Sequence, residues 1–210
     1  MEYKTVIAGP FEVNTYIVWD DKSQDKKGFI IDPAGEKILI EQVIKENNIK
    51  PQFILNTHCH IDHVALDNYF KDKLHIHLYA HKEENLLLKN LKTQGAYLGI
   101  DFSEQIIIDR YLKENEIIKV GSINIKAIFT PGHSPGSMSF LVDSTYLFSG
   151  DTIFKESIGR TDLLGGDSKK IIDSIKNKIF LLDENIIILP GHGEKSTIGY
   201  EKTNNFYVAA

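Results

Sequence analysis

The chain has 210 residues, 42% of them hydrophobic and 25% charged, with a net charge of −5 at neutral pH. This length supports one domain with a core of its own, so we expect a single domain over residues 1–210. No stretch approaches the ~20 continuous apolar residues that span a membrane, and the scattered basic residues lack the footprint of a nucleic-acid binder. The expected partner is therefore a small molecule, with no nucleic acid and no membrane.

Two further features bear on location and on metal chemistry. The first residues lack the basic flank and apolar run of a secretory signal, so the expected location is cytoplasmic. Cys59 is the only cysteine, which excludes an internal disulfide and a thiolate-rich zinc finger. Any zinc would therefore have to be held by His and Asp.

The first half of the sequence predicts short strands, followed by helices that alternate with further strands. Short apolar runs bounded by turn residues indicate strands over residues 5–7, 16–19, 29–31, 53–55 and 75–80. Helical spacing indicates helices from residue 35 to Asn47 and over residues 64–70 and 82–92. Residues 93–109 have no clean periodicity and carry Gly95 and Gly99, so they predict a mobile loop.

The second half repeats this order. Strands are expected over residues 117–120, 123–129, 139–142 and 146–148, followed by an amphipathic helix over 167–182 and an apolar strand over 186–189. Strands, then a helix, then a strand, twice over, favour an α+β fold in which two sheets pack together with helices outside.

Seven side chains of metal-ligand type follow apolar runs. They are five histidines and two aspartates: His58, His60, Asp62, His63, His133, Asp151 and His192. An H-x-H-x-D-H run has few structural reasons to exist, whereas two closely spaced divalent ions need this mixture of nitrogen and oxygen donors. We therefore expect two divalent metal ions, zinc first, with iron or manganese as alternatives.

The spacing predicts that these ligands divide into two groups. In an extended segment, residues i and i+2 project to the same side, so His58 and His60 can bind one ion. His133 lies in a Pro-Gly-His turn that follows an apolar strand. Because binding residues commonly lie on loops at strand ends, we assign His133 to the same ion.

The second ion is assigned to Asp62, His63 and His192, with Asp151 bridging both ions. Two divalent cations against two carboxylates leave positive charge that suits a developing oxyanion. A metal-bound water with its pKa lowered to about 7 supplies hydroxide at neutral pH, so no separate nucleophile is needed. Asp62 and Asp151 are accordingly the candidate catalytic carboxylates.

These segments resemble the metallo-β-lactamase superfamily. The likeness is carried by the run at 57–63, Pro-Gly-His-Ser at 131–134, Ser-Gly-Asp-Thr at 149–152 and Pro-Gly-His-Gly at 190–193. More narrowly, residues 157–162 and 197–201 resemble the small glyoxalase-II-like (hydroxyacylglutathione hydrolase-like) hydrolases. The resemblance implies an αββα sandwich of two mixed sheets, and hydrolysis of a small thioester, an S-acylated thiol, by a metal-bridging hydroxide.

Two departures from the narrower family matter. After His192 only a short tail remains, without the helical C-terminal extension that carries much of the glutathione pocket in full-length glyoxalase II. This difference argues against glutathione thioesters. The tail also reads Asn204-Asn205-Phe206 where small relatives often have Asn-Pro and an aromatic residue, a difference that we expect to be local.

Rival functions use the same side chains. A mononuclear iron persulfide dioxygenase would use only His58, His133 and Asp151, a set that suits iron and oxygen chemistry, although the Pro-Gly-His-Gly ending favours a hydrolase. Another ester, a lactone or a phosphodiester could be hydrolysed at the same site, but the basic groove expected of a nuclease is not evident. A purely structural metal site would be closed and rich in Cys.

Some nearby residues are set apart from the ligands. His75, His77 and His81 have no acidic companion in the sequence and are expected to pack or to face solvent. Cys59 should face away from its neighbouring ligands as a small buried thiol.

For two further pairs of residues, the sequence allows two interpretations each. Arg160 and Asp162 either support the metal site or form an ion pair that closes a loop. Tyr97 and Phe102 either line the substrate entrance or pack against the core.

Overall fold

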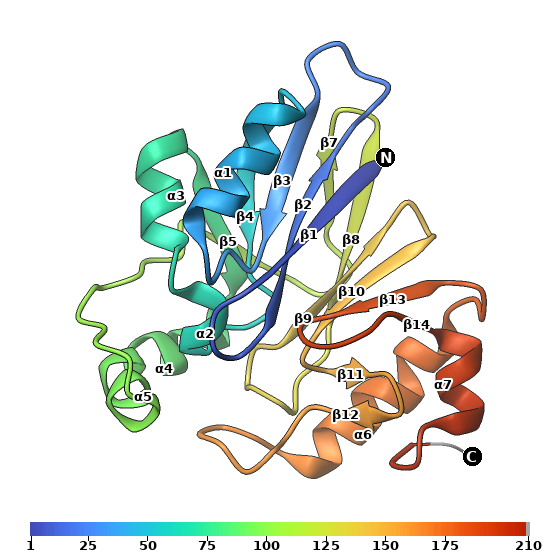
Figure 1. Ribbon diagram of the computed structural model, residues 1–210. Helices are drawn as coiled ribbons and strands as arrows, with labels where there is room; N and C mark the ends of the chain where they lie inside the picture. Colours follow the sequence, from blue (N-terminus) through green and yellow to red (C-terminus); the bar gives the residue numbers. More distant parts are fainter. Residues whose placement is uncertain (209–210) are drawn as a thin grey trace.

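Residues 1–208, which the computed structural model describes, form two six-stranded sheets packed face to face, with helices on both outer faces (Figure 1). The first sheet has the order β1-β2-β3-β4-β5-β6 and the second the order β14-β13-β10-β9-β8-β7. Both sheets are mixed, because β3 to β6 run parallel to one another and β10 pairs in parallel with β13. The predicted αββα sandwich is confirmed.

The first sheet is built from the N-terminal half of the chain. Its strands are β1 (Glu2–Ala8), β2 (Val13–Trp19), β3 (Lys27–Ile31), β4 (Lys50–Leu55), β5 (His77–His81) and β6 (Arg110–Leu112). The helical segments of this half are α1 (Lys37–Glu46), α2 (Ile61–Val64), α3 (Asp67–Leu74), η1 (Lys82–Glu84), α4 (Asn85–Leu88) and α5 (Leu91–Leu98).

The second sheet comes from the C-terminal half. Its strands are β7 (Ile117–Val120), β8 (Ile123–Phe129), β9 (Met138–Val142), β10 (Tyr146–Gly150), β13 (Ile187–Pro190) and β14 (Ser196–Thr197). A separate hairpin is formed by β11 (Ile153–Phe154) and β12 (Ser157–Ile158), and the helical segments are α6 (Ser168–Asn177), η2 (Ile179–Leu181) and α7 (Ile198–Asn204).

Strand alternation separates the apolar layers, as β2 illustrates. Tyr16 and Val18 belong to the core between the two sheets, whereas Ile17 and Trp19 belong to the core beneath the helices of the first sheet. Successive side chains of a strand point to opposite faces, so a strand covered on both faces is buried along its whole length. Every residue of β2 is indeed buried.

The outer helices bury one side each. Ile40 of α1 and Phe70 of α3 pack against the first sheet, and Ile171 and Ile175 of α6 pack against the second. The residues of α6 that face the sheet recur three to four positions apart, which is the spacing of one face of a helix. The predicted amphipathic helix thus forms, although it ends at Asn177 and is followed by a short 3₁₀ turn.

Two predictions for residues 82–109 were wrong. The expected helix over 82–92 is broken into η1, α4 and α5, with Asn90 in a non-helical conformation between the last two. The expected loop from residue 93 is helical up to Leu98. Gly95 favours a loop by its helix-breaking tendency, but it is buried inside α5, where the helix approaches Ile61 of α2 closely.

Four short elements were not predicted: β6, the β11–β12 hairpin, β14 and α7. Apart from α7, they consist of strands of two or three residues, too short to show alternation. The helix α7 does begin at a recognisable N-cap, because the side chain of Thr197 accepts a hydrogen bond from the backbone N–H of Tyr200.

Among residues 1–208, no helix is both long and apolar enough to cross a bilayer.

The core between the sheets generates a prediction about stability. Phe140 of β9 is fully buried in that core, whereas Leu181 is 77% exposed. Phe140→Ala should lower the free energy of unfolding by about 3–5 kcal/mol because it leaves a cavity, and Leu181→Ala should change it by less than about 0.5 kcal/mol. Urea unfolding with a chelator present measures both without a contribution from bound metal. Equal effects of the two substitutions would contradict the layer assignment.

Candidate metal centre

All seven predicted ligands converge at one edge of the sandwich. His58 and His60 follow β4 of the first sheet, and α2 carries Asp62 and His63. The other three follow strands of the second sheet: His133 after β8, Asp151 after β10 and His192 after β13. Strands therefore fix the positions of side chains that lie up to 134 residues apart in the sequence, from His58 to His192.

The first predicted group forms a compact cluster. His133 Nε2 lies 2.9 Å from His60 Nδ1 and 3.2 Å from His58 Nε2. Nitrogen ligands of one tetrahedral zinc ion lie about 3.3 Å apart when the Zn–N bond is about 2.05 Å. The three side chains are buried, and their ligand atoms all lie within 4.8 Å of one another. This geometry fits a single metal ion.

The second predicted group lies beside the first. His63 Nε2 is 3.2 Å from His192 Nε2 and 3.8 Å from Asp62 Oδ2. His192 Nε2 is 3.6 Å from the same carboxylate oxygen. These three ligand atoms also lie within 4.8 Å of one another, and so do ligand atoms of Asp32, His58 and His63.

Asp151 reaches both groups. Its Oδ2 lies 3.5 Å from His133 Nε2 and 3.6 Å from His192 Nε2, and its Oδ1 lies 3.5 Å from His63 Nε2. Oδ1 is buried and has no hydrogen-bond partner among the described residues. A buried carboxylate oxygen without a donor is costly, and a cation between the two groups would remove that cost.

Hydrogen bonds from the outer ring nitrogens orient the imidazoles. The Nδ1 atoms of His133 and His192 donate to the backbone oxygens of Arg160 and Phe11, each at 2.8 Å. A neutral imidazole has one N–H, so each of these rings keeps its Nε2 lone pair free. The tautomer that a metal ligand requires is thus set by the surrounding loops.

The sequence did not identify Asp32, whose carboxylate accepts hydrogen bonds from Thr57 and from the ligand His63. One carboxylate oxygen accepts from Thr57 Oγ1 at 2.6 Å and from His63 Nδ1 at 3.0 Å, and the other accepts from the Thr57 N–H at 2.7 Å. The Thr57 hydroxyl in turn lies 3.1 Å from His58 Nδ1. Asp32 follows β3 in an Asp-Pro pair, and nothing local in the sequence connects this pair with the histidines.

The imidazoles differ in how readily they hold a proton. Burial lowers the pKa of His58 well below its usual value and brings the pKa of His60 down to about 3. Burial would do the same to His63, but the nearby carboxylates of Asp151 and Asp62 outweigh it and raise its pKa to about 10. Without a metal ion, the centre therefore holds a proton at His63.

Asp151 stays ionised in this setting. Burial by itself raises the pKa of its carboxyl, but the surrounding imidazoles, His63 first, bring that pKa below the ordinary value. An ionised carboxylate is an acceptor with free lone pairs, as a metal ligand must be.

Because Gly191 has no side chain, Asp151 and His63 can lie close to this turn. A Cβ atom added to this glycine would lie 2.2 Å from Asp151 Oδ1 and 2.8 Å from His63 Cε1. Any larger residue before His192 would therefore push Asp151 or His63 out of place, which explains the Pro-Gly-His sequence at this turn.

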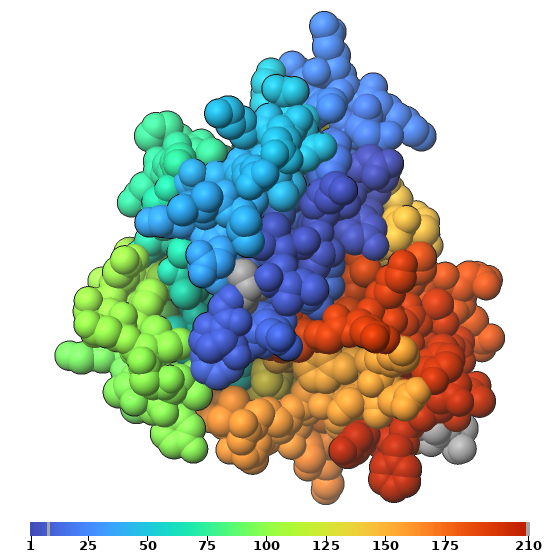
Figure 2. Space-filling model, in the orientation of Figure 1, coloured from blue at the N-terminus to red at the C-terminus, as the bar shows by residue number. Residues whose placement is uncertain are grey.

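The β1–β2 turn covers one side of the centre. On the face shown in Figure 2, this dark blue turn lies against the red segment that follows β13, with α5 in green beside it. Asn14 adds two hydrogen bonds across this contact, one to the Pro190 oxygen and one to the Gly193 oxygen, each at 3.0 Å. The loop that carries His192 is thus anchored to the first sheet.

The other residues singled out from the sequence differ in whether they are buried or exposed. The side chain of Cys59 is buried in the apolar core beneath the helices, as expected. The Arg160 guanidinium donates to both oxygens of Asp162, each at 2.7 Å, in an exposed pair. Tyr97 is 86% exposed, whereas Phe102 packs against the core.

The three histidines set aside lie outside the centre. His75 ends α3 in a left-handed conformation, and His81 stacks on Phe129 with ring centroids 4.3 Å apart. His77 is exposed, and its Nδ1 lies 3.8 Å from Asp109, so the expectation that it has no acidic companion was wrong. The sequence separation of 32 residues hid this pairing.

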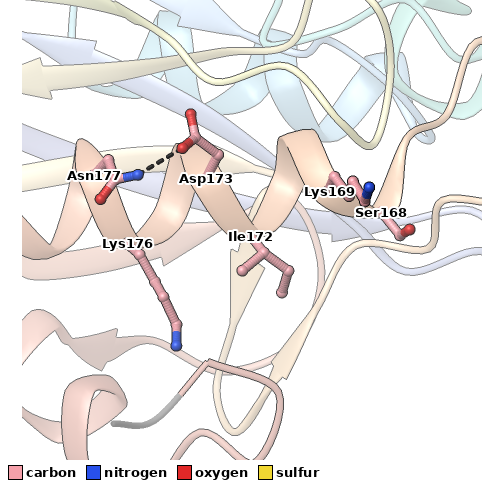
Figure 3. A pocket seen from close by; sticks show the side chains of 6 residues that line it. All are labelled: Ser168, Lys169, Ile172, Asp173, Lys176 and Asn177. Carbon is pink, nitrogen blue, oxygen red and sulfur yellow. Dashed lines mark hydrogen bonds between the residues drawn. The ribbon is translucent and has the colours of Figure 1, made fainter.

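A separate pocket of about 360 Å³ runs along α6 (Figure 3). Its six lining residues all belong to this one helix, from Ser168 to Asn177, and none of them is a predicted ligand. Within the pocket Asn177 donates to Asp173. Because it is an open surface along a single helix, it offers no convergent set of reactive groups of the kind found at the centre.

The pKa of His63 predicts how metal affinity depends on pH. A metal ion must displace the proton that His63 holds up to a pH of about 10. Because fewer protons compete as the pH rises, affinity should increase by roughly tenfold per pH unit between about pH 6 and 9. Competition with a chelator, corrected for the chelator's own protonation, measures this slope. Affinity that is flat or falls with rising pH would contradict the assignment.

Asp32 and Arg160 should respond differently to substitution by Ala. Asp32→Ala removes a side chain that orients His63 and Thr57, so we expect metal affinity to fall by roughly 10- to 100-fold. Arg160→Ala keeps the backbone oxygen that accepts from His133, so metal affinity should be unchanged. Chelator competition on both variants tests this contrast, and loss of affinity in the Arg160 variant would show that its side chain supports the centre.

Known proteins are similar to this chain over almost its whole length. "Probable metallo-hydrolase YqgX" of Bacillus subtilis is 34% identical over 208 residues, covering 98% of this chain and 96% of the relative. "Hydroxyacylglutathione hydrolase GloC" of Haemophilus influenzae is also 34% identical over 208 residues, covering 98% of this chain and 97% of the relative.

Two solved structures are similar over almost the whole fold. BLEG-1 B3 metallo-beta-lactamase superposes with a TM-score of 0.91 at 34% identity, covering all of both chains. TTHA1623 in a di-iron-bound form has a TM-score of 0.87 at 28% identity, covering 98% of this chain and all of the other. Residues 8–192 match the family model of the metallo-beta-lactamase superfamily. With its sandwich fold and its clustered His and Asp side chains, the chain belongs to the metallo-beta-lactamase superfamily.

Proposed function

We propose that this protein is a binuclear metal-dependent hydrolase that cleaves a small thioester, an S-acylated thiol. The observation that carries the proposal is the position of Asp151, whose two oxygens lie within 3.6 Å of histidines from both groups. A carboxylate between two ligand groups supports the proposal that Asp151 bridges two ions. All seven side chains, His58, His60, Asp62, His63, His133, Asp151 and His192, are the proposed ligands.

The residues fit a pair of divalent cations. The ligand atoms of each group are spaced as around one ion, and the buried Oδ1 of Asp151 lacks a donor among the described residues. When bound, two divalent ions would lower the pKa of a coordinated water to about 7 and polarise the carbonyl under attack. We propose zinc for both positions. The di-iron form of TTHA1623 makes iron the first alternative.

The side chains of the chain would hold and orient the reactants. Asp151, kept ionised by the surrounding imidazoles, would accept a hydrogen bond from the attacking water and direct it toward the carbonyl carbon. The backbone oxygens of Phe11 and Arg160 hold His192 and His133 in one orientation, so the site needs little rearrangement during the reaction.

A thioester suits this centre better than an amide. All five imidazoles are ligands in the proposal, so none of them is free to protonate a leaving group. A thiol has a pKa of about 8.5, so a thiolate departs without a proton donor, whereas an amine needs one. The name of the relative GloC, a hydroxyacylglutathione hydrolase, points to the same class of bond.

The relative also bears on the thiol. This chain covers 97% of GloC, so GloC has little length beyond the part that matches. The short tail after His192 therefore does not argue against glutathione as strongly as the sequence alone indicated. We propose that S-acylated glutathione belongs in the set of candidate substrates.

Purified protein loaded with zinc tests the proposal. It should hydrolyse S-acyl thioesters, measured as release of free thiol, and should prefer them over a lactone and a β-lactam. Asp151→Ala should lower kcat/KM by roughly 10²- to 10³-fold and should lose bound metal at the same time. Asp162→Ala, at an exposed carboxylate, serves as the control and should retain activity and metal.

Three outcomes would overturn the proposal. A single bound iron with oxygen uptake on a persulfide would favour the dioxygenase that uses His58, His133 and Asp151. Faster cleavage of the β-lactam than of every thioester would assign a lactamase activity instead. Full activity of the Asp151 variant without metal would refute the metal centre itself.

A further inference from the structure

Glu84 is a buried carboxylate outside the seven ligands. It ends η1, immediately after β5, and is fully buried. Its Oε2 accepts from the backbone N–H of Cys59 at 2.5 Å, and its Oε1 accepts from the Ser134 hydroxyl at 2.6 Å and from the Gly136 N–H at 2.7 Å. The contact is specific, because the buried N–H groups of Cys59 and Gly136 have no other hydrogen-bond acceptor among the described residues.

The segments joined by Glu84 are the two that carry the first ligand group. Cys59 lies between His58 and His60, and Ser134 follows His133 directly. The first segment follows a strand of one sheet and the second follows a strand of the other. Besides Glu84, a backbone hydrogen bond joins them, from the Met138 N–H to the Thr57 oxygen at 2.7 Å. Glu84 therefore connects, through one side chain, all three ligands of the first group.

Gly136 allows the loop after His133 to approach Glu84 closely. A Cβ atom at Gly136 would lie 2.8 Å from Glu84 Oε1, 2.9 Å from its Cγ and 2.9 Å from its backbone nitrogen. The loop after His133 approaches Glu84 as closely as a residue without a side chain allows. The close approach thus accompanies the hydrogen bond that the Gly136 N–H donates to Glu84.

We propose that Glu84 is a positioning residue for the first metal ion, setting the distance of His133 from His58 and His60. This inference rests on the proposed two-ion centre. Glu84 makes no hydrogen bond to the second group, Asp62, His63 and His192, among the described residues. Its loss should therefore affect one ion far more than the other.

An acceptor-only group is required at this position. A carboxylate can accept from all three donors, whereas the amide of Gln, of nearly the same shape, offers one oxygen and turns an NH₂ group toward the others. Burial raises the pKa of Glu84 to about 7, and the donors of Ser134, Cys59 and Gly136 oppose that rise. Measurements at about pH 8 keep the side chain in its accepting form.

Glu84→Gln is the test, with Glu201→Gln as a matched control. Glu201 is also fully buried and also accepts three hydrogen bonds, from the Glu156 N–H, Asn205 Nδ2 and the Ser196 hydroxyl. None of these partners is next to a proposed ligand in the sequence. Both variants lose a buried carboxylate, so both should unfold at lower temperature when free of metal.

Zinc titration of each metal-free protein against a chromophoric chelator separates the two ions. The wild type should bind two. In Glu84→Gln we expect the affinity for one ion to fall by roughly 10- to 100-fold while the other is retained. In Glu201→Gln the two affinities should keep their wild-type ratio. A merely structural role of Glu84 would lower the unfolding temperature without changing that ratio.

Gly136→Ala gives a second route to the same result. The added methyl group leaves the carboxylate in the sequence but displaces it, so the same ion should be weakened. If Glu84→Gln and Gly136→Ala both keep the wild-type ratio of affinities, Glu84 is not a positioning residue. If the wild type itself binds fewer than two ions, the proposed function fails first, whatever the variants do.

Discussion

Burying imidazoles and carboxylates together is costly unless every polar atom has a partner, and this constraint governs the centre. The outer nitrogens of His133 and His192 are satisfied by backbone oxygens, which leaves their inner nitrogens directed at other nitrogens. Facing lone pairs repel, so the cluster needs positive charge among them. A proton at His63 supplies some of that charge when metal is absent, and two cations would supply all of it.

The sandwich meets this constraint by building the centre from both sheets. The first sheet provides His58 and His60 and, behind them, Asp32. The second provides three ligands on separate loops, each anchored by contacts to other segments. Because the strands are fixed by buried side chains on both faces of each sheet, the loops at their ends need only short connections to hold each ligand in place. Stability of the core and geometry of the centre are thus linked.

The ligands could be predicted from the sequence because each lies in a local pattern: a dense histidine run or a glycine turn after an apolar strand. Asp32 and Glu84 could not, because their roles depend on contacts across 25 to 52 residues with side-chain and backbone groups that no local sequence pattern connects with them. The fold was predictable from strand and helix periodicity, except where short elements show no period. The segment around Gly95 failed because burial against Ile61 outweighs the helix-breaking tendency of glycine.

The most direct test of the two-ion centre is a crystal structure of the zinc-loaded protein, with anomalous scattering used to locate the metal. We expect two ions about 3.5–4 Å apart, the first bound by His58, His60 and His133 and the second by Asp62, His63 and His192, with Asp151 between them. A single ion, or ions bound away from these side chains, would contradict the binuclear centre.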